Sequence, residues 1–351
     1  MQLWAGAGSH PGMQRLCLYL AACLFLLTAS ACKKDDYLRG IDGAALFAPP
    51  TSAELAAVEA DWASRQLAPN GYRLEQTVPL NGGAELRFIS FQTGPHRTQA
   101  AVLVPSTPGP HPVQLLLSGF DINNPVYPVT LQTATSTTTP PSPFILGWVA
   151  FRGQVLRVTV DGRLYETPRS EGSVGDAFDG ATDDAQALLN IILSTVATAD
   201  ASRIAVRGGS RGGTVALLLA ERDARVRRAI SVVGPTDMLR LTQANQEDRT
   251  YQLQFLQELK EGRQTLAEAR QRLLASSPLY FAQRLPLTQL HLGSQDRIVP
   301  PAQGELLRDQ LQALSRATQL EYYRYEDRDH NNVHTHPDFA GRVEESLAPL
   351  R

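Results

Sequence analysis

From about residue 84 onward, the apolar residues of this chain fall into short runs that alternate with helical patterns. Runs at 84–91 and 98–104 alternate between apolar and polar positions around a Gly-Pro turn, which predicts an antiparallel pair at a sheet edge. Continuous apolar runs at 113–117 and 147–151 are typical of strands buried on both faces. Four further strands are predicted at 203–207, 226–233, 287–292 and 319–325.

Helical periodicity separates the later strands. Apolar residues spaced three and four apart predict helices at 183–196, 210–220 and 302–314. An earlier helix is predicted from Thr51 to about residue 66, because Thr51 and Glu54 have the spacing of a capping box. Alternating strands and helices indicate an α/β protein whose sheet is mostly parallel, with eight strands and helices on both faces.

Two stretches interrupt this alternation. Residues 155–165 alternate around Asp161-Gly162, which predicts a hairpin. Residues 238–284, after the sixth predicted strand, are charged and helical. This helical insertion is predicted either to be a lid over the carboxyl edge of the sheet or to be a peripheral helical pair without contact to substrate. The Thr- and Pro-rich stretch 133–143 is predicted to be an irregular loop.

Composition places the chain among ordinary globular proteins. It has 351 residues, 43% of them hydrophobic, and a net charge of -2, so no charge excess indicates binding to nucleic acid. All three cysteines, at 17, 23 and 32, lie near the N-terminus. The rest of the chain is therefore predicted to lack disulfides and to be stabilised by the core of one large domain, 51–351.

Residues 1–31 are predicted to be a lipoprotein signal peptide. An apolar run at 16–28 follows Arg15 and is shorter than a membrane span, which needs roughly 20 residues. The small residues before Cys32 are similar to the lipobox of bacterial lipoproteins, in which the cysteine is lipidated. Met13 is predicted to be the true start.

Residues 32–50 are predicted to form a lipidated tether and linker. The charged run 33–36 resembles a surface-export tag of bacterial lipoproteins, or it is a solvated tether. We expect an exported protein that is anchored by lipid at Cys32 to a bacterial membrane, either the outer membrane or the cell surface.

The strongest chemical signal lies where the strand predicted at 203–207 meets the next helix. Residues 208–212 read Gly-Gly-Ser-Arg-Gly and match the nucleophile elbow, a sharp strand-to-helix turn that presents a serine above the sheet. The alternative is a glycine-rich turn that cradles a phosphate. No Lys-Ser/Thr pair follows, and the G-x-G-x-x-G spacing is absent. Ser210 is therefore the predicted nucleophile.

A serine nucleophile needs a general base, and in the α/β-hydrolase order that base is a histidine near the end of the chain. His330 follows the last predicted strand directly and is the predicted base, with His334 and His336 as alternatives. A metal site built from these three histidines is a competing interpretation, but no H-E-x-x-H or carboxylate-rich signature accompanies them. The other histidines precede the serine or lie in a predicted strand: His96, His111 and His291.

The acid that orients the histidine is expected in a loop after a later strand. Asp296 follows the seventh predicted strand and is the predicted acid, because its carboxylate would hold the histidine tautomer whose Nε2 faces the serine. The alternative for Asp296 is an aspartate at a helix N-terminus. Asp237, after the sixth strand, is the second candidate for the acid or a pocket residue. The predicted oxyanion donors are the backbone amides of Arg211 and Phe120.

With these residues the chain resembles the α/β-hydrolase superfamily, in particular the catalytic domain of the prolyl oligopeptidase family and its dienelactone-hydrolase-like relatives, over residues 85–347. The stretch 147–153, Gly-Trp-Val-Ala-Phe-Arg-Gly, is similar to the family's strand that ends in Arg-Gly. Residues 277–280 and 292–300 are similar to its acid-loop region. The resemblance implies that Ser210, Asp296 and His330 form the triad.

The sequence also departs from the family pattern. Ser118-Gly119 stands where His-Gly is usual, and Arg211 stands where oligopeptidases often have tyrosine. Residues 33–81 are too few for a β-propeller.

Taken together, these features predict a serine hydrolase that cleaves an ester or amide bond through an acyl-enzyme intermediate, without a cofactor. A carboxylesterase is favoured, and a peptidase acting on short peptides is the alternative. A further alternative is a lipoprotein that uses the hydrolase fold only for binding. The expected partners are a small-molecule ester or short peptide substrate and, through the lipid anchor, a membrane.

Overall fold

The computed structural model describes residues 37–132 and 143–351. Residues 42–351 form one compact unit. The predicted signal peptide, Met13, Cys32 and almost all of the predicted loop 133–143 lie outside the described residues. In the part of the chain that is described, every helix is too short or too polar to cross a membrane.

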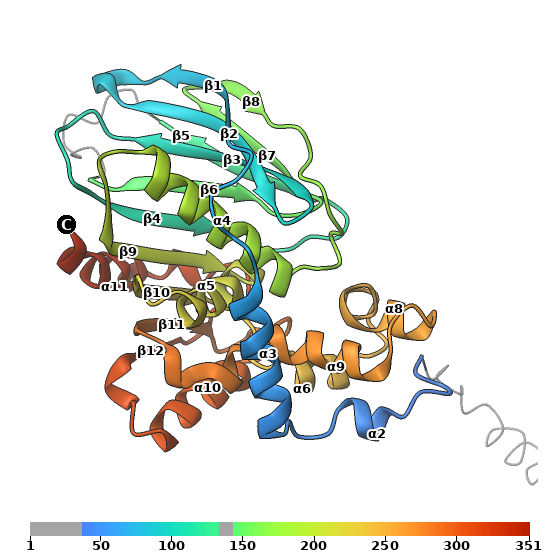
Figure 1. The fold of residues 1–351 in the computed structure, drawn as a ribbon. Coiled ribbons are helices and arrows are strands. Elements are labelled where there is room, and N and C mark those ends of the chain that lie inside the picture. The colour runs from blue at the N-terminus through green and yellow to red at the C-terminus, as the bar shows by residue number, and fades with distance from the viewer. Residues whose placement is uncertain (1–36, 133–142) are drawn as a thin grey trace, which may run out of the picture. The chain divides into compact units, whose positions relative to one another are not determined.

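The main sheet has nine strands within the described residues, in the order β1-β2-β3-β6-β4-β9-β10-β11-β12 (Figure 1). From β6 to β12 all neighbouring strands are parallel, and β1, β2, β3 and β6 are joined by antiparallel pairing. The eight predicted strands are all present, as β2 (Glu85–Thr93), β3 (His96–Val104), β4 (His111–Leu117), β6 (Ile145–Ala150), β9 (Ala199–Gly209), β10 (Val226–Val232), β11 (Leu287–Gly293) and β12 (Leu320–Tyr325).

The ninth strand, β1 (Arg73–Pro79), was not predicted. It pairs with β2 at the edge of the sheet, and six of its seven residues are exposed. An edge strand with so little buried surface carries no alternation of apolar and polar residues, which is why its sequence gave no strand pattern.

One face of the sheet is covered by helices. The helices α4 (Asp179–Thr195), α5 (Arg211–Arg222) and α10 (Ala302–Ala313) correspond to the three predicted helices. Together with the sheet they enclose the largest apolar cluster, to which β4 contributes Val113, Leu115 and Leu117. Leu116 packs on the opposite face, as expected when successive side chains of a strand alternate.

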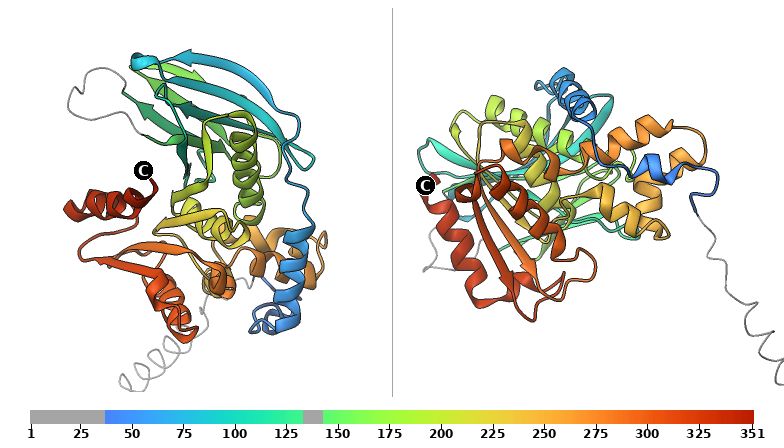
Figure 2. Two further views of the ribbon diagram at one scale, coloured as in Figure 1. Left: turned by 60° about the vertical axis from the view of Figure 1, so that its left-hand side comes forward. Right: turned by 90° about the horizontal axis from the view of Figure 1, so that it is seen from below.

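The other face differs in part from the prediction. The helix α11 (Pro337–Leu347) covers it beside β10, apart from α4 and α5 (Figure 2). Beside β6, a three-stranded sheet of β5 (Val126–Leu131), β7 (Val155–Val160) and β8 (Arg163–Glu166) takes the place of a helix. The predicted hairpin is β7–β8, and its turn residues Asp161 and Gly162 both have positive φ.

The segment before the sheet also differs from its prediction as a linker up to residue 50. The short helix α2 (Gly43–Leu46) is capped by Asp42, and Leu46 is fully buried. Arg270 donates hydrogen bonds to four backbone carbonyls of residues 45–49. These carbonyls thus have the hydrogen-bond partner that buried backbone groups need, and Leu46 is buried. This stretch is therefore packed against the domain and is not a free linker. The predicted capping box is present, and it begins α3 (Ser52–Ser64).

The insertion 238–284 is helical, as predicted. Its elements are α6 (Met238–Ala244), α7 (Arg249–Tyr251), a π-helical turn Gln252–Leu256, α8 (Gln257–Lys260), α9 (Leu266–Ala275) and a 3₁₀ segment Pro278–Arg284. Helix α9 packs against α2 and α3 (Figure 1), and the Phe255 ring stacks on Phe178 with centroids 6.0 Å apart. A role for this insertion as a lid stays a prediction.

Candidate active site

The nucleophile elbow begins where β9 ends. Ser210 has φ 53° and ψ −122°, a strained conformation that costs a residue with a side chain of the order of 1–3 kcal/mol. Its amide donates a hydrogen bond to the Val232 carbonyl at 2.8 Å, and α5 starts at the next residue. The predicted strand-to-helix turn is therefore present, with the serine at its tip.

The flanking glycines are required by close backbone contacts. A Cβ on Gly208 would lie 2.2 Å from the carbonyl carbon of Gly212. A Cβ on Gly212 would lie 2.2 Å from the Leu117 carbonyl oxygen. Both distances are far below van der Waals contact, so the strand, the helix and the end of β4 approach closely around Ser210 only because these residues lack side chains.

We expect Gly208→Ala to reduce the free energy of unfolding by about 1–3 kcal/mol or more, since the added methyl overpacks against rigid backbone. Gly209→Ala is the matched control, because a Cβ at Gly209 meets no atom within 4 Å. Urea unfolding of both variants measures the difference. Equal stability of the two variants would contradict the tight elbow.

Asp296 and His330 meet at the carboxyl edge of the sheet. Asp296 follows β11, and its Oδ2 lies 2.8 Å from the Nδ1 of His330, which follows β12. The other oxygen, Oδ1, accepts hydrogen bonds from the amides of Ile298 and Val299 at 2.9 and 2.8 Å. The carboxylate is thus fixed on both sides, and it leaves His330 Nε2 as the nitrogen free to face a reacting group.

Backbone contacts hold the two loops together. The Gln295 amide donates to the Arg328 carbonyl at 2.9 Å, and the Ser294 amide donates to the Tyr325 carbonyl at 3.0 Å. A Cβ on Gly293 would lie 2.4 Å from the Arg328 oxygen, so the loops cross where only glycine fits. The Asp296–His330 pair is therefore positioned by main chain rather than by flexible side chains.

The alternative acid, Asp237, faces away from this pair. Its Oδ1 accepts hydrogen bonds from the Tyr280 hydroxyl at 3.0 Å and the Arg240 amide at 3.1 Å, and burial raises its pKa. This carboxylate therefore caps α6 rather than contacting His330.

The other histidines have structural contacts. His291 lies in β11, between the Tyr325 hydroxyl and the Gln289 amide oxygen, and burial lowers its pKa to about 3. His336 Nδ1 accepts from the Asp338 amide at the start of α11. No group of three potential metal ligands converges within residues 37–132 and 143–351.

Ser210 and His330 open into one cavity of about 910 Å³. Ser210 and His330 make no hydrogen bond with each other, but both line this space, together with His334 and the predicted oxyanion residue Phe120. The cavity extends over the sheet face that carries Leu116 and Trp148 and reaches β5 and α11. None of its described lining residues belongs to the insertion 238–284.

The loop after β4 lies against the nucleophile. A Cβ on Gly119 would be 3.6 Å from the Ser210 Cβ. Among the described residues, neither the Arg211 amide nor the Phe120 amide donates a hydrogen bond, so both remain available for a ligand. Their role as oxyanion donors stays a prediction.

The Arg211 side chain, whose role the sequence left open, holds this loop. Its guanidinium is buried and donates to the Ser118 hydroxyl at 2.9 Å, the Gly119 carbonyl at 2.6 Å and the Gln154 side-chain oxygen at 2.8 Å. It also lies 4.6 Å from the centre of the Phe151 ring, and burial lowers its pKa to about 9. One residue thus links the elbow to the neighbouring loop.

We expect Arg211→Met to lower kcat by about 10- to 100-fold, less than the loss of an oxyanion donor itself, because the loop loses its anchor while both amides remain. Arg211→Lys keeps the charge and is expected to retain more activity. Steady-state ester hydrolysis measures the effect. An unchanged kcat with lower thermal stability would mean that the side chain only stabilises the fold.

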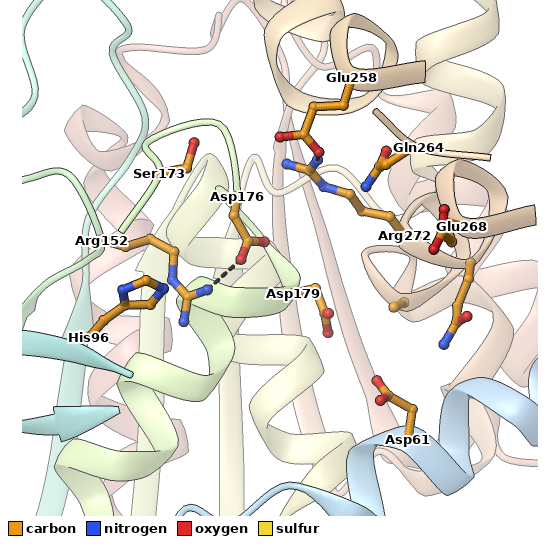
Figure 3. Close-up of a pocket in the computed structure, with 12 residues that line it drawn as sticks. Asp61, His96, Arg152, Ser173, Asp176, Asp179, Glu258, Gln264, Glu268 and Arg272 are labelled. Carbon is orange, nitrogen blue, oxygen red and sulfur yellow. Dashed lines mark hydrogen bonds and ion pairs between the residues drawn. The ribbon is translucent and has the colours of Figure 1, made fainter. Parts of the chain in front are cut away.

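A second cavity, of about 370 Å³, has none of the predicted triad residues in its lining. Figure 3 shows the residues that line it. Arg152, from the Arg-Gly stretch that resembles the family motif, points toward Asp176 there and also contacts Asp184 of α4 through its guanidinium and its amide. These contacts fix the end of β6 to α4. The Arg-Gly motif is therefore structural in this chain.

The geometry can be compared with known proteins. Residues 176–345 match the model of the prolyl oligopeptidase family. This range includes Ser210, Asp296 and His330. The search of curated proteins found no match.

Solved structures share the fold at low identity. Acetyl xylan esterase 1 from Thermoanaerobacterium sp. JW/SL YS485 aligns with a TM-score of 0.59 and 15% identity over 86% of this chain and 95% of that one. The acetyl xylan esterase from Paenibacillus sp. R4 aligns with a TM-score of 0.56 and 20% identity over 85% of this chain and 95% of that one. Pyrococcus horikoshii acylaminoacyl peptidase aligns with a TM-score of 0.50 and 15% identity over 76% of this chain and 41% of that one. These similarities show the α/β-hydrolase fold, as the sequence predicted.

Proposed function

We propose that Ser210, His330 and Asp296 are the catalytic triad of a serine hydrolase and that the substrate is a carboxylic ester. The match of residues 176–345 to the model of the prolyl oligopeptidase family supports the hydrolase. The observation that carries the proposal is the strained Ser210 at the elbow, opening into the same cavity as a histidine that is bound to a buried aspartate.

The proposed reaction has two halves. Ser210 Oγ attacks the carbonyl carbon while His330 Nε2 takes the hydroxyl proton, and Asp296 stabilises the imidazolium through Nδ1. The carbonyl oxygen gains a negative charge, and the Arg211 and Phe120 amides donate hydrogen bonds to it. The tetrahedral intermediate collapses, the leaving group takes the proton from His330, and an acyl-enzyme remains. Water repeats the sequence, so that the acid is released and Ser210 regains its proton.

Esters and peptides would be cleaved by the same triad, so the chemistry does not separate the two substrates. The ester is favoured by the share of each solved structure that aligns with this chain. The chain aligns with 95% of the Thermoanaerobacterium acetyl xylan esterase but with 41% of the acylaminoacyl peptidase. Most of that peptidase lies outside the alignment. A peptidase of the prolyl oligopeptidase family acting on short peptides is the second candidate.

A matched substrate panel separates these candidates. Short-chain 4-nitrophenyl esters and aminoacyl 4-nitroanilides, assayed with the full chain, are expected to give turnover of the esters. Turnover of the anilides alone would overturn the ester preference while leaving a hydrolase. Turnover of neither class would favour the remaining alternative, a protein that uses this fold only to bind.

A further inference from the structure

Arg207 is a charged residue in the middle of the elbow strand. Its neighbours Ile204 and Val206 pack under α4 and α5, whereas Ala205 belongs to the apolar cluster on the α11 side. Side chains alternate along a strand, so Arg207 shares the α11 side with Ala205. It lines the same cavity as Ser210, which follows three residues later.

The surroundings of the Arg207 guanidinium are apolar and aromatic. It lies 5.3 Å from the centre of the Phe339 ring, and the cavity wall beside it includes Tyr127, Trp148 and Val232. Removal from water lowers the pKa of Arg207, although the group stays charged at neutral pH. A cation in such a place normally has a partner, because an unpaired buried charge is costly.

Arg207 has no such partner. Within the described chain its guanidinium makes no hydrogen bond and no ion pair; it contacts the Phe339 ring and is influenced at longer range by Tyr127 and Glu344. The other buried arginines are paired: Arg152 with Asp184, Arg222 with Asp179, and Arg270 with Glu54. Arg211 has no carboxylate partner either, but its guanidinium donates to Ser118, Gly119 and Gln154. Arg207 differs from these four arginines because its guanidinium has neither a carboxylate nor a hydrogen-bond acceptor.

The acidic side chains near the cavity are otherwise engaged. Asp121 lines the cavity, and its Oδ1 accepts hydrogen bonds from the amides of Asn123 and Asn124. Glu344 of α11 forms its ion pair with Arg351, and its charge raises the pKa of Arg207 only from a distance. Neither carboxylate lies within ion-pair distance of Arg207, so the five donors of its guanidinium remain open to a ligand.

We propose that Arg207 binds a carboxylate of the substrate, so that the enzyme prefers an ester or amide that carries a free carboxylate near the scissile bond. A guanidinium binds a carboxylate through two parallel hydrogen bonds, and the apolar walls strengthen this contact by excluding water. The inference rests on the proposed function of Ser210. The carboxylate belongs either to the acyl part or to the leaving group.

Two pairs of substrates separate these sources. In the acyl pair, mono-4-nitrophenyl glutarate is compared with its neutral methyl ester. In the leaving-group pair, 3-carboxyphenyl acetate is compared with 3-(methoxycarbonyl)phenyl acetate. We expect the full chain to prefer the anionic member in at least one pair, by about tenfold or more in kcat/KM, the size typical of a charge-assisted hydrogen bond.

Arg207→Gln is expected to reduce this preference by about 10- to 100-fold, and Arg207→Lys by less, because lysine keeps the charge without the bidentate fork. The matched control is Arg342→Gln. Arg342 is a cation of α11 that donates to Asp338, stacks on Tyr323 and does not line the cavity. This control is expected to keep the wild-type preference.

The outcomes test the carboxylate site at Arg207 separately from the proposed hydrolase activity of Ser210. Ester hydrolysis that depends on Ser210, with the same anionic-to-neutral ratio in wild type and Arg207→Gln, overturns the carboxylate site and leaves the hydrolase standing. Hydrolysis that does not depend on Ser210 overturns the proposed function itself. An Arg342→Gln variant that loses the preference as strongly as Arg207→Gln would show a general charge effect and would also overturn the site.

Discussion

Ser210→Ala is expected to lower kcat for 4-nitrophenyl acetate by about 10⁶-fold, the loss found when a serine protease loses its nucleophile. Without the hydroxyl no acyl-enzyme forms, and any residual rate comes from the oxyanion donors and substrate binding. The elbow itself should persist, because alanine keeps the Cβ and loses only the Oγ, and the amide of residue 210 still donates to the Val232 carbonyl. Initial rates with the purified full chain measure the effect.

The matched control is Ser173→Ala, which removes a hydroxyl from the separate cavity that also contains Asp176. Its rate is expected to equal the wild-type rate. Wild-type turnover in Ser210→Ala, with both variants equally stable to urea, would contradict the assignment of the nucleophile.

His330→Ala is the second large effect, with an expected fall in kcat of about 10⁶-fold, because nucleophile and base act as a unit. Asp296→Asn is expected to cost about 10⁴-fold, since the amide would favour the wrong histidine tautomer while leaving the geometry intact. Both variants are assayed as for Ser210→Ala.

His334 supplies the internal control for this base. It lines the same cavity as His330 but makes no contact with Asp296 in the described structure. His334→Ala is expected to stay within about tenfold of wild type, well short of the loss typical of a general base. A large loss in His334→Ala together with an active His330→Ala would transfer the role of base to His334.

The sequence predicted the elements that depend on contacts between residues close in the chain or on a clear pattern of apolar and polar residues. The eight predicted strands have apolar runs or an alternation of apolar and polar residues, and the capping box of α3 is a contact between residues three apart. The order of serine, acid and histidine also follows from the topology, because loops after parallel strands meet at one edge of the sheet. For this reason the contact between Asp296 and His330 could be predicted from the sequence.

Features that depend on distant segments were missed. The β5 strand pairs directly with β7, although β6, a strand of the main sheet, lies between them in the sequence. The alternation of β5 is also weak. The anchor formed by Arg211 joins three segments through Ser118, Gly119 and Gln154, which no spacing in the sequence connects. Arg207 did carry a signal, since a charged residue interrupts an apolar strand, but its meaning depends on which groups the fold leaves near it.

The central claim is that Ser210 is an activated nucleophile. Labelling the full chain with a fluorophosphonate and mapping the adduct by peptide mass spectrometry tests it directly, because such probes phosphonylate a serine only when a base withdraws its proton. We predict one adduct, on Ser210, that is absent in Ser210→Ala and forms far more slowly in His330→Ala. No adduct on the folded wild-type chain, or an adduct that persists in Ser210→Ala, would contradict the account.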